Sequence, residues 1–302
     1  MKHKPIYVEI VMDTSMERLW EYTQNPALHA QWDLRFSDIQ YRPKESEDAP
    51  QLFTYKTKVA PFLTVEGWGE SKGTHHKKDG TRTSSLHFGT EQKISPIMEG
   101  KGFWQYVPNG EALTFLTQYD YKVRYGKLGQ ALDFVFRPVM GWATALSFDV
   151  LRRWLKTGEV PKMQYRRFFL SILIAFTFFF IWFYQGLIPK LIGLHPEEVA
   201  LFTALSGVDG MSAQSAVRII GVIEMLFGII WLLPINKSRL YLAQIVLFPL
   251  LTIGAGFASS EVFIGPFNVL TFNLALIVLS IVGYVCQQNC PTAKSCKRRR
   301  EG

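Results

Sequence analysis

Among the acidic residues and histidines in the first half of this chain, Glu66, Glu70, His75, His76 and His87 are the candidates for an acid or a base. Glu66 and Glu70 flank Trp68 at a spacing of two, so in an extended strand all three side chains share one face of a sheet. Hydrolysis or cyclisation needs such a carboxylate, or a histidine, positioned inside a cavity. His75-His76 precedes the turn signal Asp79-Gly80 and is expected at an exposed hairpin end. We therefore treat catalysis as uncertain and expect binding rather than reaction.

The usual catalytic and metal-binding motifs are missing from the sequence. It contains no G-x-S-x-G elbow, no H-E-x-x-H zinc helix, no phosphate-binding glycine loop and no dinucleotide-binding fingerprint. The three cysteines, Cys286, Cys290 and Cys296, all lie near the C-terminus, and the first two have neither redox nor zinc spacing. We expect juxtamembrane thiols, no metal site and no resident cofactor.

Polar residues inside long apolar runs are the best functional pointers in the second half. A charge within a membrane-spanning helix costs about 2.5–3.5 kcal/mol or more, so such residues tend to have a role. Glu224 falls near the centre of one apolar run, and Arg218, Gln185 and Asn273 are expected nearer the outer surface. These four residues form a predicted membrane polar site. Two interpretations stay open: hydrogen bonds that fix a helix bundle, or a site for a ligand, a quinone or a proton.

The elements that would carry these polar residues are membrane spans. A spanning helix needs about 20 largely apolar residues, and the sequence offers four such runs, at about 168–188, 215–235, 240–258 and 269–286. The basic residues gather before the first run, between the second and third, and in the tail. By the positive-inside rule, this pattern predicts a multi-pass plasma-membrane protein whose N- and C-termini are both cytoplasmic. The net charge of +8 is thereby explained without nucleic acid as a partner.

The first half has the pattern of an α+β domain. Ile6–Met12 alternates as a strand, and two short helices are expected before a run of antiparallel strands. Asn109-Gly110 predicts a hairpin turn into Ala112–Tyr125, where seven positions alternate on one face and six of them are apolar or aromatic. A long amphipathic helix is expected over Gly129–Lys156.

One face of the predicted sheet is rich in aromatic residues. Rings on such a face either line a cavity for an apolar ligand or fill the core. The candidate ligand-cavity residues are Trp32, Phe53, Tyr55, Trp104, Phe115, Tyr119, Tyr121 and Trp142.

Two family resemblances follow from these residues. The element order, together with the segment Arg137-Pro138-Val139-Met140-Gly141-Trp142, resembles the helix-grip fold of the SRPBCC superfamily, which includes START domains and polyketide cyclases. The run Trp182–Leu191, the Gly221-x-x-Glu224 stretch and Gly265-Pro266-Phe267-Asn268 are similar to the DoxX-like membrane family. The first resemblance implies an antiparallel sheet wrapped on a long C-terminal helix with a cavity between them. The second implies an all-α four-helix transmembrane bundle.

These observations predict a helix-grip ligand-binding domain over 1–160, a DoxX-like transmembrane domain over 161–290 and a basic cytoplasmic tail over 291–302. The expected function is a membrane-tethered protein that binds an apolar small molecule, with the lipid bilayer as its other partner. One alternative is a subunit of a quinone-linked membrane oxidoreductase, which would need a redox partner subunit. A further alternative is a cyclase or hydrolase that acts in the helix-grip cavity.

Overall fold

The computed structural model describes residues 4–46 and 49–300, and the chain divides into two compact units. One unit comprises Met1–Tyr165 together with Pro291–Gly302, and the other comprises Arg166–Cys290. The first of these, the soluble unit, therefore includes the segment after the last apolar helix.

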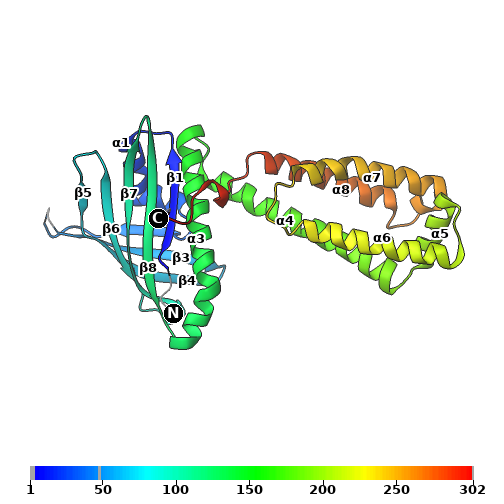
Figure 1. The fold of residues 1–302 in the computed structure, drawn as a ribbon, viewed down its shortest axis with the longest axis horizontal. Coiled ribbons are helices and arrows are strands. Elements are labelled where there is room, and N and C mark those ends of the chain that lie inside the picture. Colours follow the sequence, from blue (N-terminus) through cyan, green and yellow to red (C-terminus); the bar gives the residue numbers. More distant parts are fainter. Residues whose placement is uncertain (1–3, 47–48, 301–302) are drawn as a thin grey trace. The chain divides into compact units, whose positions relative to one another are not determined.

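The described residues of the soluble unit form an eight-stranded antiparallel sheet (Figure 1). The strand order is β1-β8-β7-β6-β4-β3-β2, with the short β5 paired to β6. The strands are β1 (Ile6–Met12), β2 (Asp38–Tyr41), β3 (Gln51–Ala60), β4 (Leu63–Ser71), β5 (Thr74–His76), β6 (Arg82–Gly89), β7 (Ile97–Asn109) and β8 (Ala112–Val123).

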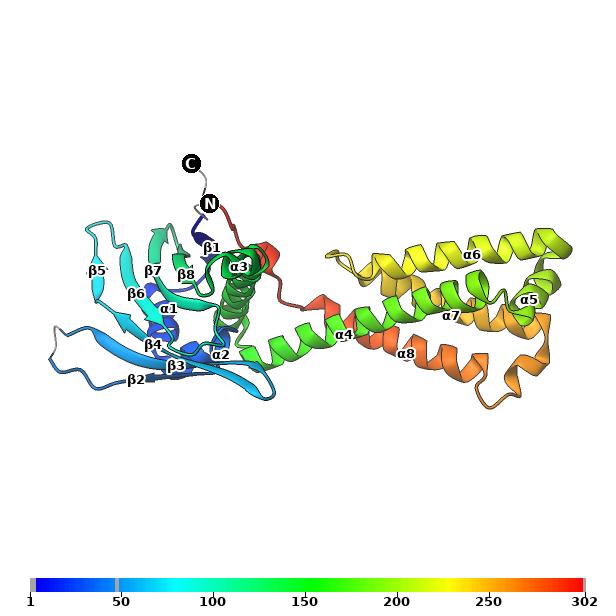
Figure 2. The same cartoon turned by 90° about the horizontal axis from the view of Figure 1, so that it is seen from below.

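The helices of this unit lie between β1 and β2 and after β8. Helix α1 (Met16–Gln24) begins where the Ser15 hydroxyl accepts a hydrogen bond from the Arg18 amide, and α2 (Pro26–Trp32) begins where Asn25 accepts from two amides. The long α3 (Gly126–Thr157) continues through Pro138 and ends at Gly158, whose φ of 76° suits glycine. Figure 2 shows the sheet curled, with α3 seen nearly end-on at its open side. The expected helix-grip architecture is confirmed.

Close contact between rings and glycines lets the aromatic face curve. Tyr55 of β3 pairs with Gly67 of β4, and a Cβ on Gly67 would lie 2.3 Å from the Tyr55 ring. The tyrosine ring therefore lies flat over the neighbouring strand instead of standing up from the sheet. The same pairing recurs where Phe53 lies over Gly69. Because these rings take little height, the inner face holds many aromatics and still wraps around α3.

The tail after the last apolar helix docks on α3 and on the edge strand β1. The Thr292 amide and the Ser295 hydroxyl donate hydrogen bonds of 2.8 and 2.9 Å to the carboxylate of Asp149 in α3. Further along, Lys297 and Glu9 of β1 exchange two backbone hydrogen bonds of 2.9 Å, as in an antiparallel bridge. The tail is thus a structural part of the soluble unit.

Asp149 is held in its charged form although its side chain is not exposed. Arg152 and Arg153 approach its oxygens at 2.5 and 3.0 Å. Burial alone would raise the pKa of Asp149, but the Thr292 amide and the Arg152 guanidinium hold it below its ordinary value. A buried carboxylate of this kind costs about 3–5 kcal/mol when its partners are removed, so the tail and the arginines stabilise each other's positions.

The second unit consists mainly of apolar helices. Five helices among the described residues are long and apolar enough to cross a membrane, and one of them is α3, which packs on the sheet. The other four are α4 (Pro161–Gln185), which continues as the π-helix η1 (Gly186–Ile192), α6 (Gly210–Ile230), α7 (Ser238–Ala258) and α8 (Val269–Gln288). The remaining short helices of this unit are α5 (Pro196–Ser206) and the 3-10 turn η2 (Ser260–Phe263), whereas the 3-10 turn η3 (Ala293–Ser295) belongs to the soluble unit. The expected long apolar helices are confirmed, although the π-helix was not foreseen.

Aromatic side chains form the centre of this bundle. Phe178 and Trp182 of α4 pack on Trp231, at the end of α6, and on Phe248 of α7, and all four are buried. The ring centroids of Phe178 and Trp231 lie 4.8 Å apart, and those of Trp182 and Phe248 lie 5.8 Å apart. Such contacts supply the van der Waals packing on which helix association in lipid depends.

Removal of the Asp149 carboxylate should release the tail. We expect Asp149→Ala to expose Cys296, whose thiol donates to the Ala145 carbonyl at 3.2 Å and whose pKa is raised to about 12 by burial. Release would restore an ordinary thiol pKa and increase the rate of alkylation by iodoacetamide at pH 8 by about tenfold or more. Peptide mass spectrometry would read Cys296 separately from Cys286 and Cys290. Ser295→Ala is a milder variant, and Asp38→Asn is the control; equal rates in Asp149→Ala and the control would contradict the role of Asp149.

Candidate functional site

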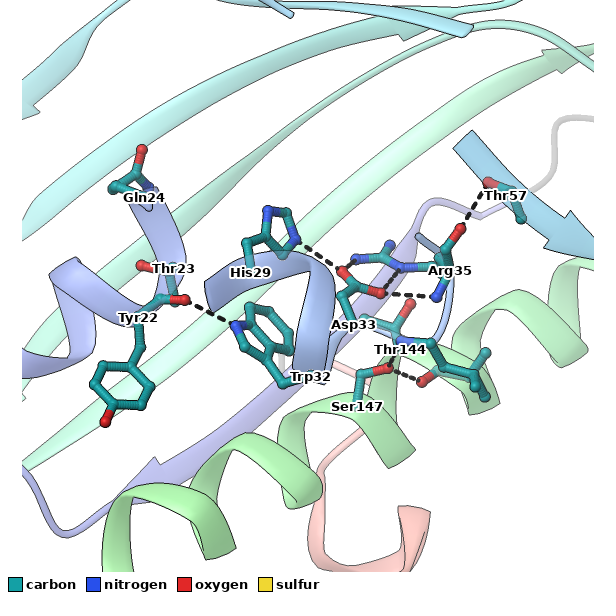
Figure 3. Close-up of polar contacts among 12 residues, drawn as sticks. Tyr22, Thr23, Gln24, His29, Trp32, Asp33, Arg35, Thr57, Thr144 and Ser147 are labelled. Atoms are coloured by element: carbon teal, nitrogen blue, oxygen red, sulfur yellow. Dashed lines mark hydrogen bonds and ion pairs between the residues drawn. The ribbon is translucent and has the colours of Figure 1, made fainter. Parts of the chain in front are cut away.

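A charged cluster lies inside the soluble unit, at the end of α2 and in the loop that follows it. The Asp33 carboxylate accepts two hydrogen bonds from the Arg35 guanidinium, 2.9 Å from Nε and 2.6 Å from Nη2. Nε2 of His29 lies 3.1 Å from the same carboxylate. Figure 3 shows the three side chains pointing toward one another beside α3. The spacing places His29 and Asp33 one helical turn apart, and the turn after α2 brings Arg35 back onto Asp33.

The cluster contains an ionised pair in a place where charge is costly. The Asp33 side chain is not exposed at all, and that of Arg35 is 13% exposed. Burial alone would raise the pKa of Asp33, but the Arg35 charge and hydrogen bonds hold it well below its ordinary value. Burial would also lower the pKa of Arg35, yet Asp33 raises it above its ordinary value. The bidentate geometry makes this a fixed ion pair rather than a mobile one.

His29 is neutral and packs as a core aromatic. Burial lowers the pKa of its imidazole, and the hydrogen bond to Asp33 offsets only part of this effect. The ring stacks on Trp32 with centroids 4.9 Å apart and meets the rings of Trp104 and Phe36 at 4.8 and 5.3 Å. With rings on three sides, the imidazole leaves no room for a substrate next to it. Its role is to hold Asp33, so it is a poor candidate for a catalytic base.

The backbone around the cluster is fixed from several elements. The Leu34 amide donates to the Ser147 hydroxyl of α3 at 2.9 Å, and the Thr57 hydroxyl of β3 donates to the Arg35 carbonyl at 2.7 Å. The Tyr165 hydroxyl donates to the Trp32 carbonyl at 2.5 Å. These bonds hold the guanidinium in one orientation because its backbone and its counter-ion are both immobilised.

Arg35 faces aromatic rings on the inner side of the sheet. Its guanidinium carbon lies 5.4 Å from the ring centre of Tyr119 and 5.6 Å from that of Phe36, which are cation–π distances. The Tyr119 hydroxyl in turn lies 2.9 Å from the Thr144 hydroxyl of α3. The arrangement therefore presents a fixed cation, a phenol and an alcohol within an aromatic interior.

The predicted ligand-cavity residues differ in how deeply they are buried. Six are buried: Trp32, Tyr55, Trp104, Phe115, Tyr119 and Tyr121. Phe53 and Trp142 are half-buried. Near α2 the rings contact one another, with Trp32 and Trp104 at 6.0 Å and Phe115 and Phe148 at 4.5 Å. The interior near α2 is therefore filled by rings, and Arg35 follows α2 between Leu34 and Phe36, which are half-buried.

The acid–base candidates from the sequence lie elsewhere. His87 contacts Glu70 at 3.3 Å and Glu99 at 2.8 Å, and Glu66 pairs with Lys56, all on the outer face of the sheet. Sequence reasoning missed His29, Asp33 and Arg35, because a histidine on a short helix and an Asp-x-Arg sequence are ordinary surface patterns. Among the described residues, no group of three or more His, Cys, Asp or Glu is arranged to hold a metal.

The second unit has its own buried charges. Lys190 of η1 lies 3.0 Å from Glu224 of α6 and 3.4 Å from Glu198 of α5. The pair forms where the two helices touch through glycine: a Cβ on Gly221 would lie 2.7 Å from the carbonyl oxygen of Gly186. Sequence reasoning found Glu224 but missed Lys190, because a lysine beside Pro189 looks like the basic end of a span.

The other predicted membrane polar residues have separate environments. Asn273 of α8 donates to the Thr252 hydroxyl of α7 at 2.9 Å, so it joins two helices. Arg218 is exposed on α6, and Gln185 is half-buried at the end of α4. Within the described residues, the ion pairs of Glu224 are thus made by Lys190 rather than by Arg218.

Comparison with known proteins identifies the family. The whole chain aligns with the uncharacterized membrane protein YndG of Bacillus subtilis (strain 168), with 38% identity over 307 residues that cover 100% of both proteins. This chain belongs to the YndG family. Residues 179–281 also match the model of the DoxX-like family. The YndG family therefore carries a DoxX-like membrane domain after its helix-grip domain, as the sequence resemblance implied.

Solved structures similar to this YndG-family chain align with less than half of it. The crystal structure of TTHA0849 from Thermus thermophilus is 14% identical, covers 45% of this chain and 86% of its own, and has a TM-score of 0.35. A STAR-related lipid transfer protein from Xanthomonas axonopodis is 16% identical over 49% of this chain and 84% of its own, with a TM-score of 0.38. Human StAR-related lipid transfer protein 5 is 14% identical over 49% and 73%, also with a TM-score of 0.38.

The neutral His29 should make stability depend on pH. The pKa of His29 is below 6.5 in the folded protein, so the unfolded chain binds more protons as the pH falls. Stability is then complete above pH 6.5 and is lost as the pH falls through and below that value. We expect the thermal midpoint of the detergent-solubilised wild type to fall between pH 8 and pH 5 more steeply than that of His29→Gln. His87→Gln, on the outer face, is the control, and parallel curves for wild type and His29→Gln would contradict the assignment.

Proposed function

We propose that this protein binds an apolar small molecule that carries one polar end, in the helix-grip domain, and that the DoxX-like helices tether this domain to the membrane. The observation that carries the proposal is Arg35. An ionised guanidinium is held by Asp33 inside an aromatic interior and keeps 13% of its side chain exposed. A guanidinium is planar and carries its donors in a rigid fork, so one held in place can recognise an oxygen acceptor from a fixed direction.

The guanidinium is suited to orient the ligand's polar end. Two of its five N–H donors are used by Asp33. The guanidinium carbon lies 5.4 Å from the centre of the Tyr119 ring, and the Tyr119 hydroxyl lies 2.9 Å from that of Thr144. A carboxylate, carbonyl or hydroxyl oxygen placed there would accept charge-assisted hydrogen bonds. A few polar groups within an apolar pocket are typical of small-molecule sites.

The N-terminal half of α3 offers apolar surface for the rest of the ligand. Leu128, Leu132, Val135 and Val139 follow one another at helical spacing and are 49–65% exposed. This row flanks the sheet-facing positions Gly129 and Asp133, which are buried. An apolar molecule that contacts this row and the half-buried inner rings would remove apolar surface from water at both places, which favours binding.

Attachment to the membrane would bring such a binding domain close to apolar ligands. Apolar ligands concentrate in bilayers, and a domain on the same chain as four spans meets them at an effective concentration of about millimolar. The orientation that we propose has both termini in the cytoplasm and the bundle in the plasma membrane. It is supported by the basic residues that cluster before α4, between α6 and α7 and after α8.

Catalysis in the same interior is less well supported. A cyclase or hydrolase would need an acid or base that is free to exchange a proton with the ligand. Both oxygens of Asp33 are engaged by Arg35, and the imidazole of His29 is enclosed by rings. These groups are arranged to hold a charge still, which suits recognition better than proton transfer.

The test is mass spectrometry of small molecules that co-purify with the full-length protein. We expect a lipid-like ligand with wild type and with Arg42→Gln, an exposed control. The amount should drop by about tenfold or more in Arg35→Gln, because a charge-assisted hydrogen bond is lost. Since Arg35→Gln leaves Asp33 unpaired, the double variant Asp33→Asn/Arg35→Gln, which removes both charges, is measured beside it. Equal ligand content in all four proteins would contradict the role of Arg35.

A second candidate function, a subunit of a quinone-linked oxidoreductase, is favoured by the ion pair between Lys190 and Glu224. A quinone takes up protons when it is reduced, and the ammonium and carboxylate of such a pair provide a proton donor and acceptor within the apolar bundle. Glu198, at 3.4 Å from Lys190, would connect the pair to the loop region. The electrons would have to come from a redox partner subunit.

The quinone hypothesis is tested by extraction of quinones from the purified full-length protein. We expect Glu224→Gln to lower the bound quinone relative to wild type, with Glu261→Gln in the α7–α8 loop as the control. Quinone that is absent from wild type, or that is unaffected by Glu224→Gln, would contradict this second function. The outcome is independent of Arg35, so the two functions can be separated.

A further inference from the structure

A cavity of about 780 Å³ opens at the β1 edge of the soluble unit, apart from the Arg35 cluster. Its walls are the start of β1, the N-terminal half of α3 and the C-terminal tail. Five cations line it: Lys4, Arg137, Lys297, Arg298 and Arg299. Asp133 and Phe134 are also in the lining.

The tail builds one wall of this cavity. Asp149 holds Thr292 and Ser295, and the backbone bridge to Glu9 fixes Lys297. The chain then runs on past β1, so Arg298 and Arg299 lie with the first residues of that strand around the same cavity. A basic tail that served only to contact lipid head groups would need no such docking on the soluble unit.

The charges of the lining are only partly neutralised. Arg137 is paired with Asp133 at 2.8 Å and with Asp120 at 2.7 Å. Lys297 faces Glu9 at 4.0 Å. Within residues 4–46 and 49–300, Lys4, Arg298 and Arg299 have no carboxylate in ion-pair contact. The cavity therefore carries an excess of positive charge, which favours an anion with several acceptor oxygens.

Part of the lining is apolar. Phe134 of α3 lines the cavity and is 79% exposed. The buried Ile6 of β1 and the ring of Pro138 of α3 also line it. A ligand that contacts both the cations and these apolar side chains has an anionic group joined to an apolar body.

We propose that this cavity binds the phosphate group of an anionic phospholipid, with Arg298, Arg299 and Lys4 around the phosphate and Phe134 against the adjoining apolar part. Guanidinium groups match phosphate oxygens with paired donors, and the volume suits a head group with its glycerol. The site goes beyond the ligand proposed for the interior, because it shares no residue with the Arg35 cluster. A free phosphate ester would offer the same anion without the apolar body.

The experiment titrates full-length protein in a non-ionic detergent with dihexanoyl phosphatidylglycerol, and calorimetry measures the affinity. We expect saturable binding that weakens by about tenfold or more in Arg298→Gln/Arg299→Gln. The matched control is Lys294→Gln/Arg300→Gln, which removes the same charge from the same tail at positions outside the cavity lining. Lys4→Gln, which changes β1 and not the tail, should also weaken binding. Cys296 that stays protected from alkylation in each variant shows that the tail is still docked.

The outcomes separate the sources of the anion. Inorganic phosphate and glycerol 3-phosphate should compete only weakly, and Phe134→Ala should weaken the lipid but not inorganic phosphate. If inorganic phosphate competes as strongly as the lipid, the phospholipid assignment is overturned. Equal weakening by the two double variants, or no saturable binding, would overturn the site itself. Neither result bears on the ligand that co-purifies through Arg35, so the two proposals fail separately.

Discussion

The soluble unit depends on buried carboxylates that are paired with arginines. Asp33, Asp133 and Asp149 have no exposed side chain, and each is paired with at least one arginine. An ionised carboxylate without a partner at such a place would cost several kcal/mol, so each aspartate determines where its arginine must lie. Asp33 sets the direction of Arg35, Asp133 places Arg137 at the β1 edge, and Asp149 gathers two arginines and the tail. The proposed binding sites stand at the first two of these pairs.

The aromatic face surrounds the Asp33–Arg35 pair with an apolar, low-dielectric interior. Rings that lie flat over glycines, as Tyr55 lies over Gly67, allow the sheet to curve around α3 without large gaps. Near α2 the rings fill the interior, and Arg35 lies against the ring of Tyr119. In a low-dielectric interior a fixed guanidinium attracts an oxygen acceptor more strongly than it would in water. Packing and recognition are therefore two effects of the same arrangement.

The second unit also pairs its buried charges with opposite charges. Close contact between Gly186 and Gly221 brings η1 against α6, and the contact allows Lys190 to reach Glu224. Because the two side chains have opposite charges, the pair lowers the free-energy cost of placing each charge inside an apolar bundle. The YndG family combines this DoxX-like bundle with a helix-grip domain, and the segment after the last helix belongs to the helix-grip domain. The chain thus leaves the soluble unit after Tyr165 and returns to it at Pro291.

The sequence by itself determined the elements, and the tertiary structure decided which polar residues meet. Alternation over Ala112–Tyr125 and the apolar runs predicted β8 and the spans, because periodicity and length are local properties. The Asp33–Arg35 pair was hidden, since burial depends on the whole sheet and α3 closing over a short loop. The docking of Thr292 and Ser295 on Asp149 joins residues more than 140 positions apart, and Lys190 meets Glu224 only because a π-turn and a glycine contact align two helices. Such pairings arise from the packing of distant segments, which no local pattern records.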